Sequence, residues 1–413
     1  MKLWIFGLAL ACVLSMLSPF PAKCGESEQN QRELKLYAQS AVLMDGRTGR
    51  VLYGKNQDQV RPMASTTKIM TCILALELGE LSDTVTATSY AASQPEVHMG
   101  VRAGEEYRLE DLLYALMLES YNDAAVMIAE HIGGSVENFL DMMNQKARDL
   151  GCENTCFLTP NGLDAQKEGE EGTAFHSTTA TELGRIMNYC VSQSPVKDEF
   201  LKITGTGNYY FTSLDGKRQF SCVNHNALLQ SMEGMISGKT GFTSGAGYSY
   251  VGTVEDGGRL FTIVLLGCGW PPHKTWKWSD AALLINYGRE NYHYREIYRE
   301  ISLPDLVVKN GIPSKGELKG EAEAACEVGG DKSLRLLMRD DEQVTVRRFI
   351  DRELTAPVRE GQLVGSVDYI LNGETVGSFP VVLKEGVNKI TVLWCLGQVL
   401  QQCFSHGWIS ALN

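Results

Sequence analysis

Apolar residues in the first 300 positions occur in two kinds of run. Short runs bounded by turn residues predict two pairs of strands, at 41–44 and 51–53 and at 248–254 and 260–266. Longer runs with helical periodicity predict helices at 69–78, 109–118, 123–132, 139–150, 181–191 and 279–287. Because the order is strands, helices, strands and a last helix, we expect one antiparallel sheet covered by helices over residues 35–300.

The pattern changes after Leu303 and Pro304. Short strand-like runs come next, separated by Gly, Asp and Asn turns, at 334–338, 344–349, 363–369 and 379–383. Residues 304–388 are therefore predicted to form a small all-β domain, in which no cluster of chemically active side chains is found. The fold class is α+β, and a length of 413 residues favours two domains.

The last segment, 391–413, is amphipathic. One helical stripe would carry Leu393, Gly397, Leu400, Phe404, Trp408 and Ala411, and the opposite side Gln398, Gln401, Gln402 and Ser405. Such a helix is typical of a membrane interface, and it is too polar for a transmembrane span. Because its polar side lacks Lys and Arg, docking on the β domain or on a partner protein is the alternative.

The first 25 residues have the layout of a secretory signal peptide. A short charged start precedes the apolar run 3–17, and cleavage is expected between Ala22 and Gly25. An uncleaved anchor is the alternative, because Phe20 fits a cleavage site after Ala22 poorly. A cleaved signal peptide predicts an exported protein.

The net charge and the spacing of the cysteines argue against nucleic-acid binding, a disulfide framework and a cysteine-based metal site. The net charge of −12 and the pI near 5.2 argue against nucleic acid as a partner. Eleven cysteines are scattered without the spacing of a disulfide framework or a metal site. Most are expected to be buried thiols, although Cys152 and Cys156 flank a turn and could form a disulfide.

Candidate chemistry begins at Ser65-Thr66-Thr67-Lys68, at the start of the first predicted helix. At helical spacing the Ser65 hydroxyl and the Lys68 amine lie one turn apart on the same face. A serine needs an adjacent base to act as a nucleophile, and a lysine can serve when burial or a nearby cation lowers its pKa. The helix N-terminus adds backbone N–H groups where an oxyanion could form.

One Ser-x-x-Lys is weak evidence, because a second copy occurs at 194–197, where a proline and polar neighbours predict a structural loop. Two later motifs distinguish Ser65 from this copy. Ser120-Tyr121-Asn122 and then Lys239-Thr240-Gly241 come further along the chain, each found once. Three elements in this order form a strong signature of a serine hydrolase site.

The surroundings of these motifs predict a shared cleft. Ser120 and Asn122 fall in the short connection between two predicted helices, and Lys239 falls on or beside an edge strand between glycines. A cation at Lys239 close to Lys68 would favour a neutral, basic amine on Lys68. His176 precedes a helix-capping Ser-Thr-Thr run, and we interpret it as a structural hydrogen-bonding residue outside the site.

These motifs, together with Thr159-Pro160-Asn161-Gly162-Leu163, the signal segment, the β-rich domain and the tail, resemble the low-molecular-mass penicillin-binding proteins that act as serine-type D-Ala-D-Ala carboxypeptidases. The resemblance covers nearly the whole chain. It implies a β-lactamase/transpeptidase-like catalytic domain that removes the terminal D-alanine from peptidoglycan stem peptides and is acylated by penicillin. It also implies a location on the outer face of the bacterial cytoplasmic membrane, and it implies no metal or cofactor.

The resemblance implies a role for each matching residue. Ser65 would attack the carbonyl between the last two D-alanines, Lys68 would be its base, and Ser120 would pass a proton to the departing D-alanine. The substrate-binding residues would be Asn122, Lys239, Thr240 and Gly241, with Lys239 and Thr240 on the terminal carboxylate. The backbone N–H groups of Ser65 and Phe242 would form the oxyanion hole. Some relatives carry histidine at the position of Phe242.

Two other functions fit parts of this pattern. A class A β-lactamase shares the three motifs and needs a glutamate-activated water. Glu168, Glu170 and Glu171 lie in the right interval, but in a predicted solvent-exposed loop without the expected downstream Leu-Asn. A catalytically inactive wall-binding or β-lactam-sensing protein would have no need of Lys68. The intact motifs therefore favour the carboxypeptidase.

Overall fold

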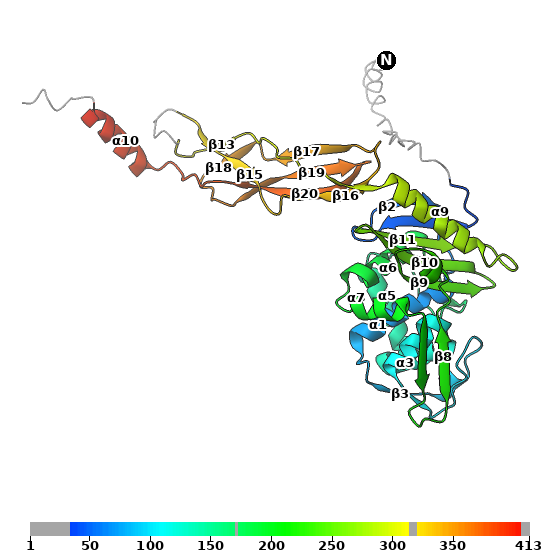
Figure 1. The fold of residues 1–413 in the computed structure, drawn as a ribbon. Coiled ribbons are helices and arrows are strands. Elements are labelled where there is room, and N and C mark those ends of the chain that lie inside the picture. The colour runs from blue at the N-terminus through cyan, green and yellow to red at the C-terminus, as the bar shows by residue number, and fades with distance from the viewer. Residues whose placement is uncertain (1–33, 170–171, 314–319, 406–413) are drawn as a thin grey trace, which may run out of the picture.

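The computed structural model describes residues 34–169, 172–313 and 320–405. These residues form a mixed α/β domain and an all-β domain that projects from one end of it (Figure 1). The predicted signal segment, 1–25, and the end of the tail, 406–413, lie outside the described residues.

A five-stranded antiparallel sheet is the centre of the N-terminal domain, with the order β2-β1-β11-β10-β9. The strands are β1 (Ser40–Asp45), β2 (Val51–Lys55), β9 (Met235–Thr243), β10 (Gly247–Asp256) and β11 (Arg259–Leu266). The early hairpin joins the three later strands because β1 pairs with β11. This order leaves β9, which carries Lys239-Thr240-Gly241, at one edge of the sheet.

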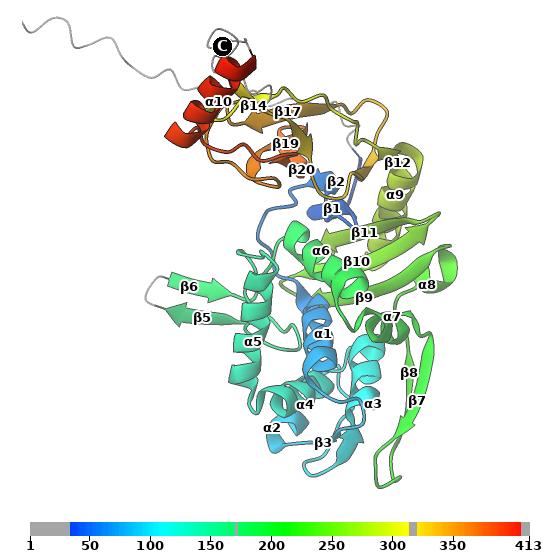
Figure 2. The same cartoon turned by 90° about the vertical axis from the view of Figure 1, so that its left-hand side faces the viewer.

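Both faces of this sheet are covered, so the central strands β1 and β11 are buried along almost their whole length. Alternate residues of β11 enter different cores. Ile263 and Leu265 pack on the side of α9 (Trp276–Asn291), and Val264 and Leu266 on the side of α6 (Ala180–Asn188) (Figure 2). The predicted arrangement of a sheet covered by helices is therefore found.

Helix α1 (Lys68–Leu78) runs through the helical layer, and every residue from Lys68 to Leu76 is buried, as its almost uninterrupted apolar sequence requires. Ser65 lies in the 3₁₀ turn η1 (Ala64–Thr67), directly before it. The other helical elements are α2 (Ser89–Ala92), α3 (Leu109–Tyr114), η2 (Ala115–Glu119), α4 (Asn122–Gly133), α5 (Val136–Asp149), η3 (Tyr189–Gln193), α7 (Lys197–Gly205) and α8 (Leu228–Ser231).

Some elements of this domain differ from the predictions. The acidic segment predicted as a loop forms part of a hairpin, β5 (Gln166–Gly169) with β6 (Gly172–Phe175). Lys197 opens α7 instead of lying in a loop, since a proline two residues ahead is compatible with a helix start. Two further strand pairs were not predicted: β3 (Thr84–Thr86) pairs with β4 (Glu106–Arg108) across a connection that includes α2, and β7 (Asn208–Thr212) forms a hairpin with β8 (Gln219–Val223).

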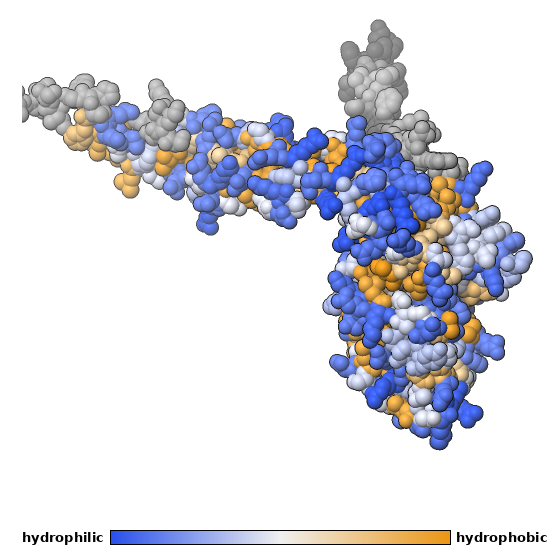
Figure 3. All heavy atoms as spheres, viewed as in Figure 1, coloured by the Kyte–Doolittle hydropathy of each residue, from blue (hydrophilic) through white to orange (hydrophobic). Residues whose placement is uncertain are grey.

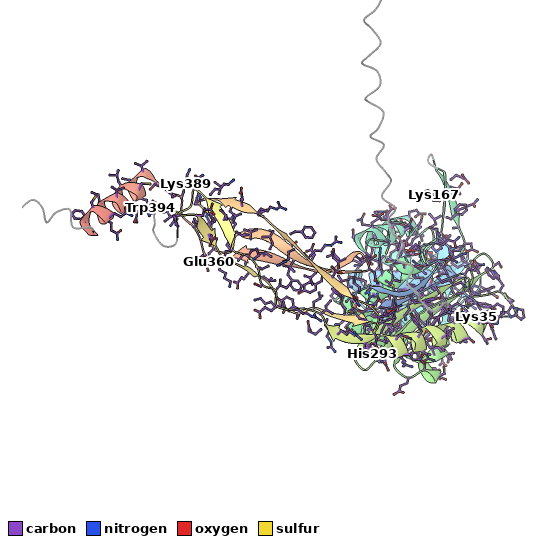
Figure 4. All side chains as sticks on the ribbon, turned by 90° about the horizontal axis from the view of Figure 1, so that it is seen from above. Lys35, Lys167, His293, Glu360, Lys389 and Trp394 are labelled. Atoms are coloured by element: carbon purple, nitrogen blue, oxygen red, sulfur yellow. The ribbon has the colours of Figure 1, made fainter. Side chains whose placement is uncertain are left out.

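The C-terminal domain has its own apolar core between short strands. One sheet has the order β15-β20-β19-β17 and another the order β14-β13-β18. Their bounds are β13 (Leu306–Lys309), β14 (Ala322–Ala324), β15 (Cys326–Val328), β17 (Val344–Ile350), β18 (Glu353–Thr355), β19 (Leu363–Leu371) and β20 (Glu374–Leu383). At the junction with the N-terminal domain, β12 (His293–Glu296), whose first residue is labelled in Figure 4, pairs with β16 (Arg335–Met338). Arg50 forms an ion pair with Glu342 at the same junction.

Helix α10 (Val392–Ser405) lies at the far end of the β domain (Figures 1 and 4). Apolar side chains on it that are between 48% and 83% exposed are Val392, Leu393, Leu396, Val399, Leu400 and Phe404. In Figure 3 the surface at that end of the molecule carries hydrophobic patches among hydrophilic residues. Among the described residues, no helix combines the length and the apolar character needed to cross a membrane.

Candidate active site

The three predicted motifs meet between the helical layer and the edge of the sheet. Ser65 is held in η1 and faces β9, which carries Lys239 and Gly241. A Cβ atom built on Gly241 would stand only 2.9 Å from Ser65 N, so the absence of a side chain allows the strand to approach Ser65 closely. Residues separated by more than 170 positions thus form one site.

Lys68 makes three polar contacts through its Nζ atom. This atom lies 3.0 Å from Ser65 Oγ, and it donates to Asn122 Oδ1 at 2.9 Å and to the main-chain oxygen of Asn161 at 2.5 Å. A neutral amine has two hydrogens and one lone pair. Because two carbonyl oxygens take both hydrogens, the lone pair is left for the Ser65 hydroxyl. The geometry is that of a base beside its nucleophile.

The surroundings of Lys68 favour this neutral state. Its side chain is fully buried, and burial lowers its pKa well below the usual lysine value. The positive charge of Lys239 lowers this pKa further, whereas the Asp123 carboxylate opposes the shift.

Ser120 lies in the connection between η2 and α4 with φ +66°, a left-handed conformation that is uncommon for a residue with a side chain. Its Oγ is 3.0 Å from Lys239 Nζ. Asn122 opens α4, where its backbone N–H donates to Val97 O at 2.8 Å and its Nδ2 donates to Pro95 O at 3.1 Å. The segment between α2 and β4 therefore fixes the amide that contacts Lys68.

Lys239 is also buried, and burial lowers its pKa to about 7, against an opposing effect of the Glu119 carboxylate. Its Nζ donates to Thr240 O at 3.0 Å. Glu119 itself accepts the backbone N–H of Val223 at 2.6 Å and contacts His225 Nε2 at 2.9 Å. A lysine with a pKa near neutrality can respond to an anionic ligand by gaining a proton.

Phe242 comes directly after the last motif on β9. Its side chain is 41% exposed, and its ring centroid lies 4.6 Å from that of Tyr248 on β10, the residue paired with it. The Phe242 side chain therefore presents an apolar surface next to Lys239-Thr240-Gly241. Its backbone continues β9 beyond Gly241, the residue that approaches Ser65.

Asn161 and Asp123 are site residues to which the sequence alone assigned no role. Asn161 acts through its carbonyl, and its Nδ2 donates to Gln94 Oε1 at 3.1 Å. Asp123 accepts backbone N–H groups from Met99, Gly100 and Val101, which orders the loop beside Asn122. The main-chain oxygen of Asn161 cannot be recognised from the residue type. Asp123, in contrast, directly follows the Ser-x-Asn motif, and this position is a signal in the sequence.

The second Ser-x-x-Lys forms no serine–lysine pair. Ser194 is buried and donates to Glu77 Oε1 at 3.0 Å, whereas Lys197 is exposed. In the acidic segment, Glu168 is exposed and accepts from Thr173 Oγ1 at 2.9 Å. Glu170 and Glu171 lie outside the described residues.

His176 is buried, and its Nε2 lies 2.7 Å from Oγ1 of Thr67, the last residue of the turn η1 that holds Ser65. Cys152 and Cys156 are free thiols, so the possible disulfide between them is not formed. Within the described part of the chain, no group of three or more His, Cys, Asp and Glu residues is placed to hold a metal ion.

Residues 26–268, more than half of the chain, match the family model described as D-alanyl-D-alanine carboxypeptidase. The chain belongs to the D-alanyl-D-alanine carboxypeptidase family. Residues 304–389 match the model described as the C-terminal domain of penicillin-binding protein 5.

Individual relatives extend over both domains. D-alanyl-D-alanine carboxypeptidase DacF of Bacillus subtilis (strain 168) is 28% identical over 397 residues, which are 94% of this chain and 95% of DacF. The crystal structure of penicillin-binding protein 5 from Haemophilus influenzae is similar, with a TM-score of 0.66 and 27% identity over 87% of this chain and 99% of that one. Penicillin-binding protein D2 from Listeria monocytogenes, in its cefotaxime-bound form, has a TM-score of 0.52 and 28% identity over 62% of this chain and 98% of its own.

The predicted family and fold class are therefore confirmed. So is the prediction of a serine D-Ala-D-Ala carboxypeptidase that acts in peptidoglycan processing. The β-lactamase and the catalytically inactive binding protein are not favoured.

Proposed function

We propose that this carboxypeptidase removes the terminal D-alanine of a peptidoglycan stem peptide through an acyl-enzyme on Ser65. The observation that carries the proposal is the arrangement around Lys68 Nζ, which lies 3.0 Å from Ser65 Oγ while both hydrogens of a neutral amine are taken by carbonyl oxygens. Ser65 is the nucleophile and Lys68 its base.

In the first step Ser65 Oγ bonds to the carbonyl carbon between the last two D-alanines, and its proton moves to Lys68 Nζ. The carbonyl oxygen becomes an oxyanion, which the N–H groups of Ser65 and Phe242 stabilise. The close approach of Gly241 to Ser65 N supports this pairing of donors, because it brings the two backbones together.

In the second step the bond between carbonyl carbon and nitrogen breaks, and the departing amine gains a proton from Ser120 Oγ. Ser120 in turn takes the proton that Lys68 received from Ser65, so that Ser120 keeps its hydroxyl and Lys68 is neutral again. Lys239 Nζ, 3.0 Å from Ser120 Oγ, orients that hydroxyl. Water then attacks the acyl carbon with Lys68 as base, and Ser65 regains its proton as the shortened peptide leaves.

Asn122, Lys239, Thr240 and Gly241 bind the substrate. Lys239 and Thr240 hold its terminal carboxylate, and the arriving anion favours the protonated form of a lysine whose pKa is about 7. Gly241 allows the peptide backbone to lie along β9, and Asn122 contacts the substrate amide. β-Lactams carry a similar carboxylate and acylate the same serine, in line with the cefotaxime-bound relative.

We further propose that the chain is exported by residues 1–25 and acts on the outer face of the cytoplasmic membrane. Residues 35–300 are its catalytic domain, 304–388 its β domain, and 391–413 a helical tail that lies on the membrane surface. The exposed apolar side chains of α10 support the last assignment, since an amphipathic helix buries such a face in the lipid interface.

Mass spectrometry of the protein lacking residues 1–25 tests the enzymatic part. Incubation with penicillin is expected to add one penicilloyl group on Ser65, and a peptide ending in D-Ala-D-Ala is expected to lose D-alanine. The Ser65→Ala variant should do neither. Rapid penicillin turnover without peptide cleavage would identify a β-lactamase instead, and the absence of both adduct and cleavage would reject the proposal.

Co-sedimentation with lipid vesicles tests the tail. The protein lacking residues 1–25 should bind vesicles, and the double variant Leu393→Gln, Leu400→Gln should not, because it removes two exposed apolar side chains from α10. Gln398→Ala, on the same helix, serves as the control and should leave binding intact. Equal sedimentation of all three proteins would reject the membrane assignment and favour docking on a protein.

A further inference from the structure

A chain of hydrogen bonds behind Ser65 has no part in the mechanism described above. His176 is 3% exposed, and its Nδ1 accepts the backbone N–H of Leu158 at 3.0 Å. In a neutral ring the proton is then on Nε2, which donates to Thr67 Oγ1 at 2.7 Å. Because the Thr67 oxygen is the acceptor in this bond, its own proton is available, and the hydroxyl donates it to Ala64 O at 2.8 Å.

The last bond in this chain acts on the nucleophile's backbone. The carbonyl of Ala64 and the N–H of Ser65 belong to the same planar peptide unit, in which the two groups point in opposite directions. A bond that holds the oxygen therefore sets the direction of the N–H. This N–H is one of the two donors assigned to the oxyanion hole.

The peptide between Ala64 and Ser65 has a strained backbone that requires stabilising contacts. Ala64 has φ +51°, in the left-handed region that costs a residue with a Cβ about 1 kcal/mol or more. The peptide is also packed against Gly162, where an added Cβ would stand 2.1 Å from Ala64 O and 2.9 Å from Ser65 N. The unit is thus confined both by backbone contact with Gly162 and by the Thr67 hydrogen bond.

We propose that His176 and Thr67 are positioning residues that hold the Ser65 N–H in the orientation of an oxyanion donor. Neither side chain has to touch the substrate. The inference rests on the proposed function, because it assumes that Ser65 is the nucleophile. It assigns a task to a histidine that lies 109 positions from Thr67 in the chain and that the sequence alone places outside the site.

The protonation state of the ring is compatible with this task. Burial and the positive charge of Lys68 lower the pKa of His176 to about 4, so the ring is neutral at working pH. Its other close neighbour is the Phe157 ring, with centroids 6.0 Å apart, which carries no charge. A second proton on the ring would remove the acceptor for Leu158 and loosen the first bond of the chain.

Two variants of Thr67 separate positioning from packing. Thr67→Val keeps the volume and removes the hydroxyl, and Thr67→Ser keeps the hydroxyl. Loss of a whole oxyanion donor costs about 10²- to 10³-fold in rate, so a misdirected donor should lower penicillin acylation of Thr67→Val by about tenfold or more. Thr67→Ser should stay within about threefold of the wild type.

A peptide boronic acid ending in a D-Ala analogue gives a second readout, because its tetrahedral adduct on Ser65 places an oxygen in the oxyanion hole. Its affinity should fall about tenfold in Thr67→Val and much less in Thr67→Ser. A purely structural role would lower the melting temperature without this selective loss. Equal acylation rates and equal boronate affinities of the two variants would overturn the proposal.

If Thr67→Val does not fold, variants of His176 distinguish a positioning role from a purely structural one. The amide of His176→Gln can reach Thr67 as a donor, whereas that of His176→Asn is too short and can replace only the acceptor for Leu158. We expect faster acylation by the Gln variant, and equal rates would contradict the inference. Ser65→Ala distinguishes failure of the proposed function from failure of the positioning role. An adduct on Ser65→Ala would reject the proposed function itself. A normal Ser65 adduct in Thr67→Val, with unchanged acylation rate, would reject only the positioning role.

Discussion

The Nζ atom of Lys68 lies 2.5 Å from the main-chain oxygen of Asn161. This oxygen belongs to a loop and not to any of the three motifs. Together with Asn122 Oδ1 it accounts for both hydrogens of a neutral amine, and it therefore links the shape of the loop to the basicity of the lysine. The charge of Lys68 is the property on which the first prediction depends.

Acylation by penicillin should rise with pH through an inflection well below the usual lysine pKa, because burial and Lys239 favour the neutral amine. Stopped-flow or quenched acylation at a series of pH values measures the inflection. Lys68→Met should lower the rate by about 10²-fold or more. Lys197→Met, in the second Ser-x-x-Lys, is the matched control and should behave as wild type. An inflection at an unshifted lysine pKa would remove Lys68 from the role of base.

Glu119→Gln should weaken substrate binding at neutral pH. The Glu119 carboxylate raises the pKa of Lys239, so its removal lowers that pKa further below about 7 and reduces the protonated fraction. A fall of one pKa unit would weaken carboxylate binding at pH 7 by roughly fivefold, and the loss should shrink at pH 6. Titration of a D-Ala-D-Ala peptide into the Ser65→Ala background isolates binding from chemistry. A loss that does not depend on pH would point to a structural effect of the substitution.

Gly162→Ala should impair both folding and acylation. Its φ of +86° disfavours a Cβ, and that atom would overlap Ala64 O at 2.1 Å. We expect a loss of roughly 2 to 5 kcal/mol in the free energy of unfolding, from strain and overpacking together. Gly104→Ala is the matched control, since Gly104 has φ +88° and no atom within 4 Å of an added Cβ.

The control should lose only the strain, roughly 1 to 2 kcal/mol, and keep wild-type acylation. Chemical denaturation and penicillin acylation measure the two effects. Similar results for the two glycine variants would show that contact with the Ala64 peptide is unimportant.

His176 predicts a dependence of stability on pH. Its pKa in the folded protein is about 4, below the usual 6.5, so the unfolded chain binds the proton more tightly. The stabilising contribution is complete above pH 6.5 and is lost as the pH falls towards 4, by up to about 1.4 kcal/mol per pH unit. Between pH 7 and 5 the wild type should therefore lose about 2 kcal/mol more than His176→Gln in urea unfolding. Parallel curves for the two proteins would contradict the low pKa.

The sequence motifs predicted which side chains the structure brings together in the candidate site. Ser65 and Lys68 are three positions apart at a helix start, and the order of the later motifs indicated the rest. The β5–β6 hairpin was missed because its strands are exposed on both sides, so neither periodicity nor apolar content marks them. Long-range contacts such as that between His176 and Thr67 depend on how the chain folds back, which spacing does not encode.

Backbone groups form a second class that the sequence does not reveal. The oxygen of Asn161 and the peptide between Ala64 and Ser65 act through atoms that every residue possesses. Only the glycines that make room for them, Gly162 and Gly241, leave a trace in the sequence, and their purpose becomes visible when the distance to the neighbouring backbone is known.

The buried amine of Lys239 is also expected to take up and release protons during the catalytic cycle. With a pKa of about 7, this amine is only partly protonated in the free enzyme at neutral pH. If it binds the terminal carboxylate as proposed, each substrate draws a fraction of a proton from the solvent on arrival, and the departing D-alanine returns it. The apparent heat of substrate binding should therefore vary with the ionisation enthalpy of the buffer, although this lysine forms no covalent bond during the reaction.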